Sequence, residues 1–398
     1  MKILIVAPFV PWPLAHGGRI RLYHLLRGLA ESNEVTLVCL SEEQNPDVGD
    51  LYDFCRQVVT VFHKPAFISC FWRFLTGSVP YNAVRFHSHK LYEKLTELIR
   101  IRDFDLVHLE TTHIWSAAAF CGDLPVVLGT QNIESKILRQ LEQRCTNSLK
   151  RLLYRLEIRK MQQFEESAWR SCRLCLAVSN DERLEMIASG APADRVITVP
   201  NGVDLQRFVL TPRPGGKRLL FLCGLDYHPN MDAARWLLND IWPLIRRSVP
   251  DASLMLAGRK TDQLPLPVDA GVSGLGDPSD VPACFATADA LLVPLRIGAG
   301  TRLKILEAMA AGLPVISTSC GCEGTLARTG EHLLQAETPA AFAAACKVLL
   351  SDPAISTNIS AAARKLVEEN YSWRAIGLGL SNHFVNINWE KDKHGIGL

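Results

Sequence analysis

A strand–loop–helix–strand segment at 290–317 constrains the fold of this chain more than any other stretch. Ala290–Val293 is a short apolar run that ends at a proline, as is typical of a strand buried on both faces of a parallel sheet. A helix is predicted from Thr301, its N-cap, to about Ala311, where a glycine and a proline end it. The next strand opens at Leu313–Ile316. Alternation of apolar strands with helices at this spacing predicts an α/β fold with parallel sheets.

The loop between this strand and this helix has the composition of an anion site. Gly298 and Gly300 free the backbone just before the helix N-terminus, where N–H groups lack helical partners and the dipole favours negative charge. Thr301, Lys304 and Glu307 recur every three residues, so they lie along one side of the helix. The helix start would bind phosphates, and the Glu307 carboxylate would bind vicinal hydroxyls such as those of a ribose. Together they would form a nucleotide site. A surface helix with a Lys–Glu pair would show the same spacing.

Three passages together resemble a known family. They are GAGTRLKILEAMAAGLPVIST at 298–318, AVSNDER followed by VITVPNGVD within 177–204, and the stretch 221–258 that begins FLCGLDYHPNMDAARWLL. With these passages in the expected order, the chain resembles the retaining glycosyltransferases of family 4 (group 1). The resemblance implies the GT-B fold, in which two Rossmann-like, doubly wound parallel-sheet domains face each other across a cleft.

Length and composition agree with two domains. The chain has 398 residues, of which 48% are apolar and 21% charged, enough for two sizeable cores. A formal charge of +2 is too small to indicate nucleic acid as a partner. Neither a membrane-spanning apolar run nor a signal-peptide core is evident, and the twelve cysteines are scattered. We therefore expect a cytoplasmic protein with reduced thiols.

Two cysteine pairs have spacings that could form half of a metal site. Cys172 and Cys175 are separated by two residues, and Cys320 and Cys322 by one. Neither has a partner pair at zinc-like spacing, so no metal site and no cofactor is predicted.

Strand–helix alternation restarts at Arg218 after a turn-rich stretch, which marks the junction between the domains. We predict an N-terminal, acceptor-side domain over 1–205 and a C-terminal, nucleotide-sugar-binding domain over 206–370. A final helix within 371–390 is expected to cross back to the first domain, with Trp373 as its packing anchor.

The first strand and the loop after it repeat the geometry of the 290–317 segment. Lys2–Ala7 is predicted as the central strand, and the following loop ends in Gly17 and Gly18 before a helix that runs to about residue 31. These glycines would let the backbone approach a substrate or donor phosphate, and Arg19 or Arg21 would supply positive charge. Alternatively, the glycines serve only the turn. The resemblance favours the first reading, because this loop faces the cleft in the family.

Gln131 stands at the C-terminal end of a predicted strand, where α/β sheets place ligands. Many family members have a histidine at this position, so the role of Gln131 is carried over only weakly. The family's common motif also has two glutamates eight residues apart. Glu307 matches the second, which binds the ribose in the family, but Ala299 replaces the first. His108 is interpreted as a histidine of the core or sheet edge.

The loops after the second domain's strands supply the remaining candidates. The resemblance implies that two basic residues bind the donor diphosphate. We take Lys260 and Arg302 as this pair, and Arg259 is less favoured. Alternatively, Arg259 and Lys260 are an ordinary solvent-exposed pair. The catalytic candidates are Lys260, Arg302 and Gln131. The donor-binding candidates are Gly17, Gly18, Asn201, Gly224, Asp226, Gly276, Gly300, Thr301, Leu303, Lys304 and Glu307.

The stretch Ala66–Leu75 is rich in large aromatic residues and is flanked by basic ones. Such a helix suits a membrane interface, and 67–75 is where a lipid-linked acceptor would dock; an ordinary packed helix is the alternative.

The resemblance implies a retaining, metal-independent transfer of a sugar from a nucleotide-sugar to a glycan or lipid-linked acceptor, in cell-surface polysaccharide or glycolipid synthesis. Such an enzyme would be cytoplasmic or peripheral on the inner face of the plasma membrane. Two alternatives remain: a non-catalytic, glycosyltransferase-like partner protein, and a nucleotide-sugar epimerase of similar fold.

Overall fold

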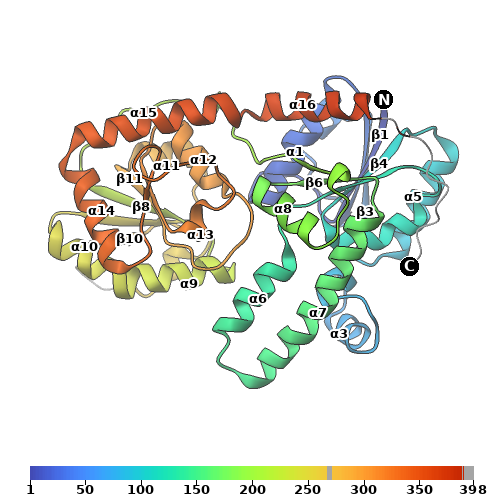
Figure 1. The fold of residues 1–398 in the computed structure, drawn as a ribbon, viewed down its shortest axis with the longest axis horizontal. Coiled ribbons are helices and arrows are strands. Elements are labelled where there is room, and N and C mark those ends of the chain that lie inside the picture. The colour runs from blue at the N-terminus through green and yellow to red at the C-terminus, as the bar shows by residue number, and fades with distance from the viewer. Residues whose placement is uncertain (267–270, 388, 390–398) are drawn as a thin grey trace. The chain divides into compact units, whose positions relative to one another are not determined.

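The computed structural model describes residues 1–266, 271–387 and 389. The chain forms two compact units (Figure 1). Unit 1 comprises Met1–Pro200 together with the C-terminal helix from Trp373, and unit 2 comprises Asn201–Ser372. The sequence predicts these boundaries at 205/206 and 370/371. Each unit is built on a single parallel sheet covered by helices, so the predicted α/β fold class is confirmed.

In the described part of unit 1, seven parallel strands lie in the order β3-β2-β1-β4-β5-β6-β7. Their bounds are β1 Lys2–Ala7, β2 Glu34–Ser41, β3 Gln57–Phe62, β4 Leu106–Glu110, β5 Val126–Gly129, β6 Leu174–Ala177 and β7 Val196–Thr198. Strands β1, β4 and β5 are almost wholly buried, as expected for apolar strands covered by helices on both faces.

The strand order reverses direction at β1. The chain passes from β1 to β2 and β3 on one side, and then from β4 to β7 on the other. In an open parallel sheet, ligands bind outside the carboxyl ends of the two strands at such a switch point. For unit 1, those strands are β1 and β4.

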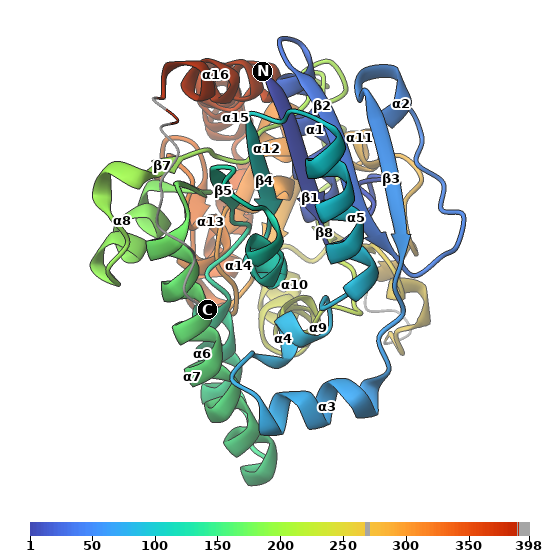
Figure 2. The ribbon, with the colours of Figure 1, turned by 90° about the vertical axis from the view of Figure 1, so that its right-hand side faces the viewer.

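Helices cover both faces of this sheet (Figure 2). They are α1 Gly17–Ala30, α2 Leu51–Phe54, α3 Phe67–Thr76, α4 Tyr81–Val84, α5 His89–Ile101, α6 Glu134–Arg144, α7 Ser148–Ser171, α8 Asn180–Ala188 and α16 Trp373–Asn386, with 3₁₀ turns at Thr112–Phe120 and Ala193–Arg195. Helices α6 and α7 form an antiparallel hairpin (Figure 1).

The last helix, α16, packs on α1 through a glycine contact. A Cβ on Gly28 would lie 2.6 Å from the Cα of Gly377, and the reverse holds, so the two backbones touch. One turn away, the buried Trp373 ring stacks on His24 with centroids 5.2 Å apart. The predicted return of the final helix and the anchoring role of Trp373 are both present within unit 1.

Helix α7 also stabilises the start of two other helices. The Glu165 carboxylate accepts hydrogen bonds from the backbone N–H groups of Glu134 and Ser135, at 2.7 and 3.3 Å. Two turns earlier, Glu157 accepts from Tyr81 and its neighbour at the start of α4. A carboxylate at a helix N-terminus satisfies N–H groups that have no helical partner. Helix α7 thereby fixes the position of α6, whose first residue borders the cavity described below.

In the described part of unit 2, six parallel strands lie in the order β10-β9-β8-β11-β12-β13. The strands are β8 Arg218–Leu222, β9 Ser253–Ala257, β10 Val272–Gly274, β11 Ala290–Val293, β12 Val315–Ser317 and β13 Leu334–Gln335. The helices are α9 His228–Trp236, a π-helical segment Leu237–Ile241, α10 Trp242–Ser248, α11 Val281–Ala286, α12 Leu303–Ala310, α13 Ser319–Cys322, α14 Pro339–Ser351 and α15 Pro353–Asn370, with a 3₁₀ turn at Thr261–Gln263. The switch point lies between β8 and β11.

Candidate functional site

The predicted donor residues of unit 2 gather at the carboxyl ends of its strands. Gly224 and Asp226 follow β8, Lys260 follows β9, and Gly276 follows β10. The loop 294–302 follows β11 and leads into α12. Because β8 and β11 flank the switch point, the structure places these loops where an open α/β sheet binds its ligand.

Lys304 joins the two strands of the switch point. It stands on α12, and its Nζ donates to the carbonyl oxygen of Leu222, the last residue of β8, at 2.6 Å. The ammonium also lies 5.5 Å from the centre of the Phe221 ring. Burial lowers the pKa of Lys304 to about 8, with Cys223 and Glu307 opposing that shift. The side chain therefore still carries its charge at neutral pH.

Glu307 lies one turn further along α12 and is 9% exposed. Burial raises the pKa of its carboxyl to about 7, while the charges of Arg207 and Lys304 act in the opposite direction. A carboxyl with this pKa is divided between its two protonation states at neutral pH, so a ligand that donates hydrogen bonds to it favours the charged state.

The start of α12 differs from the sequence prediction. The helix begins at Leu303, and its N-cap position is Arg302, not Thr301. The Thr301 hydroxyl instead donates to the carbonyl oxygen of Gly324 at 3.1 Å, and its own carbonyl accepts from the Asn201 amide at 3.0 Å. Predicted site residues therefore hold the glycine loop in place from outside the helix.

Arg302, a predicted catalytic residue, bends back over its own loop. Its guanidinium donates to the carbonyl oxygens of Ala299 and Gly300. A Cβ on Gly298 would lie 2.0 Å from Nη2 of Arg302, so a larger residue there would have to displace this guanidinium. In this structure Arg302 shapes the loop, and its charge is held beside the loop carbonyls.

The loop after β9 shows which member of the basic pair is engaged. Arg259 forms a bidentate ion pair with Asp226, with Nη2 at 2.8 Å from Oδ2. The Lys260 side chain is exposed and, among the described residues, has no hydrogen-bond or ion-pair partner. Of the two, Lys260 is the cation that remains available to an anionic ligand.

Unit 1 has a cavity at its own switch point. It has a volume of about 210 Å³ and lies at the carboxyl ends of β1, β4 and β5. The residues that line it are Pro8, Phe9, Phe86, Thr111, Thr112, His113, Gln131, Asn132 and Glu134. Thr111 has a positive φ of 74°, and its buried hydroxyl has no hydrogen-bond partner among the described residues. Strained backbone and unpaired buried polar atoms concentrate at binding sites.

Gln131, the third catalytic candidate, is part of this cavity. Its Nε2 donates to the buried carboxylate of Glu110 at 3.0 Å, and lies 3.4 Å from the carbonyl oxygen of Gly18. Glu110 in turn accepts from His108, which is fully buried, as the sequence predicts for a core histidine. The contact between Gln131 and Glu110 is not evident from sequence, because the two residues belong to different strand–loop junctions.

The structure places the glycine pair within helix α1, and the two candidate arginines of this helix donate to backbone carbonyl oxygens. Gly17 and Gly18 form the first turn of α1 instead of preceding it. Arg21 is buried and donates to the carbonyl oxygens of Val199 and Pro200, at 2.9 and 3.1 Å. The expectation that Arg21 supplies charge to a ligand is therefore wrong. Arg19 donates to the carbonyl oxygen of Trp12 at 3.1 Å.

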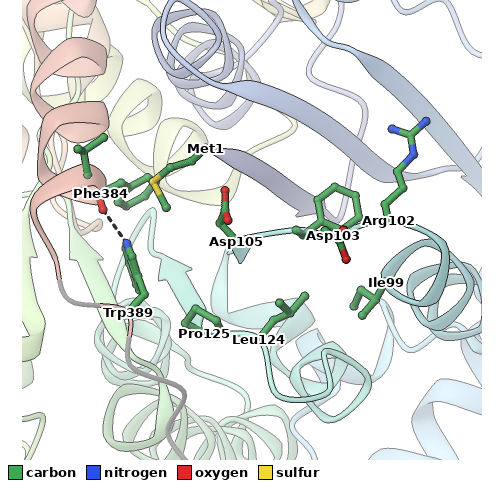
Figure 3. Close-up of a pocket in the computed structure, with 11 residues that line it drawn as sticks. Met1, Ile99, Arg102, Asp103, Asp105, Leu124, Pro125, Phe384 and Trp389 are labelled. Atoms are coloured by element: carbon green, nitrogen blue, oxygen red, sulfur yellow. Dashed lines mark hydrogen bonds between the residues drawn. The ribbon is translucent and has the colours of Figure 1, made fainter.

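A larger cavity of about 590 Å³ lies at the opposite edge of the unit 1 sheet (Figure 3). Met1 and Asp105 line it at the amino ends of β1 and β4, and Phe384 and Trp389 close it on another side. The Trp389 indole donates to the carbonyl oxygen of Phe384 at 2.6 Å. Parallel α/β sheets bind ligands at the carboxyl ends of their strands, so this cavity is not assigned to the reaction.

The described residues contain neither a candidate membrane-spanning helix nor a candidate metal cluster. No helix among them is both long and apolar enough to cross a membrane. No group of three or more His, Cys, Asp or Glu side chains in the same residues is arranged to hold a metal ion.

Comparison with known families decides the assignment. A model described as glycosyltransferase family 4 matches residues 15–207, and one described as glycosyl transferases group 1 matches residues 216–352. The chain belongs to the group 1, family 4 glycosyltransferases. The predicted family is thereby confirmed.

Solved structures with the same fold cover this glycosyltransferase almost completely. Sucrose-phosphate synthase from Thermosynechococcus elongatus is 16% identical, with a TM-score of 0.71 over 97% of this chain and 98% of its own. The Anabaena protein HepE, solved with UDP and glucose, is 16% identical, with a TM-score of 0.69 over 97% of this chain and all of its own. The fold is GT-B.

Curated relatives are more similar in sequence. An uncharacterised 44.6 kDa protein in the cps region of Klebsiella pneumoniae is 24% identical over 86% of this chain and 89% of its own length. The phosphatidyl-myo-inositol mannosyltransferase of Mycobacterium tuberculosis is 26% identical over 75% of this chain and 79% of its own.

Proposed function

We propose that this glycosyltransferase moves a sugar, with retention of configuration and without a metal ion, from a nucleotide-sugar held by unit 2 to a glycan or lipid-linked acceptor held by unit 1. The observation that carries the proposal is the position of Lys304 and Glu307, one turn apart on α12, at the switch point of the unit 2 sheet. A diphosphate beside Lys304 and the α12 N-terminus would place a ribose diol within reach of Glu307.

In this scheme the negative charge that develops on the leaving diphosphate is stabilised by protein cations. Lys304 and the exposed Lys260 supply two of them, and backbone N–H groups at the start of α12 supply further donors. Arg302 would add a third charge if donor binding draws it away from its loop carbonyls. The relatives named above support a role in the synthesis of a cell-surface polysaccharide or glycolipid. We propose that the enzyme acts on the cytoplasmic side of the plasma membrane.

A thermal-shift panel of UDP-, GDP-, ADP- and dTDP-sugars tests the donor site. One nucleotide class at 100 times its dissociation constant should stabilise the protein by about 2.7 kcal/mol. Glu307→Ala should abolish the shift. The control is Glu331→Ala, which removes an exposed carboxylate outside α12 and should leave the shift intact. A shift that survives in Glu307→Ala would contradict the ribose role. Stabilisation without any sugar transfer would favour the alternative of a non-catalytic partner protein.

Donor affinity should depend on pH through Glu307. The free site has a pKa of about 7, and hydroxyl donors favour the carboxylate, so binding expels a proton at or below neutral pH. If only the charged form binds, lowering the pH from 8 to 6 weakens the affinity about tenfold, a figure that follows from linkage. Calorimetry with the intact nucleotide-sugar measures this change. Glu307→Gln should bind weakly and keep only the roughly twofold opposite change that follows from the charging of Lys304, whose pKa is about 8. The same slope in that variant as in the wild type would assign the proton to another group.

We also propose that α3 contacts the membrane. Phe67, Ile68 and Trp72 are 61–71% exposed, while Cys70 and Phe74 face the protein. Lys160 of α7 anchors the inner side of the helix by donating to the carbonyl oxygens of Phe74 and Gly77. Figures 1 and 2 both show α3 at one end of unit 1, beside α7. An exposed aromatic face held this firmly is suited to a lipid interface.

Vesicle sedimentation tests this contact. The double variant Phe67→Ser/Trp72→Ser should bind vesicles rich in phosphatidylglycerol at least tenfold more weakly, because burying each aromatic ring contributes about 1.5–3 kcal/mol. Leu184→Ser, which alters a 52% exposed residue of α8 in the same unit, is the matched control. Equal binding by wild type and the double variant would show that α3 is an ordinary surface helix.

A further inference from the structure

We infer that Glu110 is a positioning residue: it fixes the side-chain amide of Gln131 so that Oε1, an acceptor, is the atom that meets a sugar hydroxyl in the unit 1 cavity. This inference rests on the proposed function, since it assigns a chemical preference to the site where unit 1 would bind substrate. Gln131 lines the cavity, whereas Glu110 contacts Gln131 without lining the cavity itself.

The orientation of the amide follows from its contacts. Nε2 of Gln131 lies 3.0 Å from Oε1 of Glu110 and 3.4 Å from the carbonyl oxygen of Gly18, and both partners are acceptors. The two protons of Nε2 are thus directed at protein atoms. A ligand group that reaches Gln131 meets its oxygen and must itself be a donor, as every sugar hydroxyl is.

The carboxylate that holds the amide is itself held. Glu110 is 0% exposed, and its Oε2 lies 3.1 Å from Nε2 of the equally buried His108. Burial alone would raise the pKa of Glu110, but His108, the charge of the buried Arg21 and the Gln131 amide together hold it below its usual value. Glu110 is therefore a carboxylate, which can only accept.

Two glycines show that the backbone is built around this arrangement. A Cβ on Gly129 would lie 2.4 Å from Oε2 of Glu110 and 2.6 Å from Nε2 of His108. A Cβ on Gly18 would lie 2.5 Å from Oε1 of Gln131. Any larger residue at either position would displace the carboxylate or the amide. Immediately after Glu110, the strained Thr111 directs the chain into the cavity wall.

Side-chain amide NMR on the full-length protein, labelled with ¹⁵N-glutamine, tests the positioning without any substrate. Gln131→Asn identifies the Gln131 signals by their loss. We expect these signals to move in Glu110→Gln and also in Glu110→Asp, which retains a charge opposite Arg21 but is too short to reach the amide. Glu182→Gln is the matched control, because it neutralises another buried carboxylate that faces the charge of Arg21, on helix α8. Unmoved signals in both Glu110 variants, or equal movement in Glu182→Gln, would overturn the inference.

Turnover then tests the role of the fixed amide, with the nucleotide-sugar that stabilises the protein as donor. Glu110→Asp should lower kcat about tenfold or more, the scale of one lost hydrogen bond to a charged group, with the donor KM nearly unchanged. In a Gln131→Leu background the same change should have little further effect, because the two residues act as one unit. Additive losses would mean that Glu110 acts only on stability. A panel in which no nucleotide stabilises the protein would count against the proposed function while leaving the NMR result valid.

Discussion

Replacing Lys304 by methionine is expected to lower kcat/KM for the donor about 100- to 1,000-fold, the usual cost of removing one preorganised group that stabilises transition-state charge. Lys304 links α12 to the end of β8 at the switch point, so its ammonium lies where the diphosphate would bind. Methionine keeps the approximate length of the side chain but removes the ammonium, which lies 5.5 Å from the centre of the Phe221 ring. The assay is the initial rate of nucleoside diphosphate release.

The same substitution should not lower the melting temperature. Burial lowers the pKa of Lys304 to about 8, which means that its charge is less stable in the folded protein than in water. Methionine is uncharged, so this destabilisation of the folded state disappears in the variant. Loss of activity with stability retained is therefore the expected signature. Lys347→Met, at an exposed position of α14, is the control and should resemble wild type in both measurements. Activity of Lys304→Met within threefold of wild type would remove Lys304 from the donor site.

Most strands of both sheets could be predicted from sequence because their signal is local, but the short edge strands β10 and β13 were not predicted. The sequence predicts strands over 2–7, 57–62, 253–257 and 290–293, and β1, β3, β9 and β11 have these bounds, since buried strands of a parallel sheet are continuous apolar runs. Helices α5, α6 and α11 were not predicted. The sequence also predicts one helix over 231–247. The structure divides this region into α9, which begins at His228, a π-helical segment and α10.

The site could be predicted by position but not by contact. Lys304, Glu307 and the glycine loop lie at the carboxyl edge of the sheet because their order along the chain places them there. Thr301 was expected to cap α12, yet its hydroxyl bonds to Gly324, which is distant in sequence. The same holds for Arg21, whose partners are some 178 residues away. Hydrogen bonds that depend on tertiary packing leave no local pattern.

Gly258→Ala should be the most destabilising single substitution in the donor region. Gly258 has a φ of 135°, and a Cβ there would lie 1.9 Å from the carbonyl oxygen of Cys223 and 3.0 Å from the backbone nitrogen of Gly224. Neither atom can retreat easily, because Leu222 and Ala257 just before them are paired in the sheet. We expect a loss of more than about 4 kcal/mol in the free energy of unfolding, a size that marks a specific structural conflict.

Gly330→Ala separates this conflict from the cost of an unusual backbone angle. Gly330 has a φ of 79°, but a Cβ there meets nothing within 4 Å among the described residues, so alanine should cost only about 1–2 kcal/mol. Urea unfolding of both variants measures the difference. Gly258 also donates its N–H to the carbonyl oxygen of Gly276 at 2.7 Å, so Gly258→Ala should lose the donor-induced thermal shift, whereas Gly330→Ala should keep it. Equal costs in the two variants would mean that the β8 and β9 loops can separate, and the close approach of their backbones would then be unnecessary for the site.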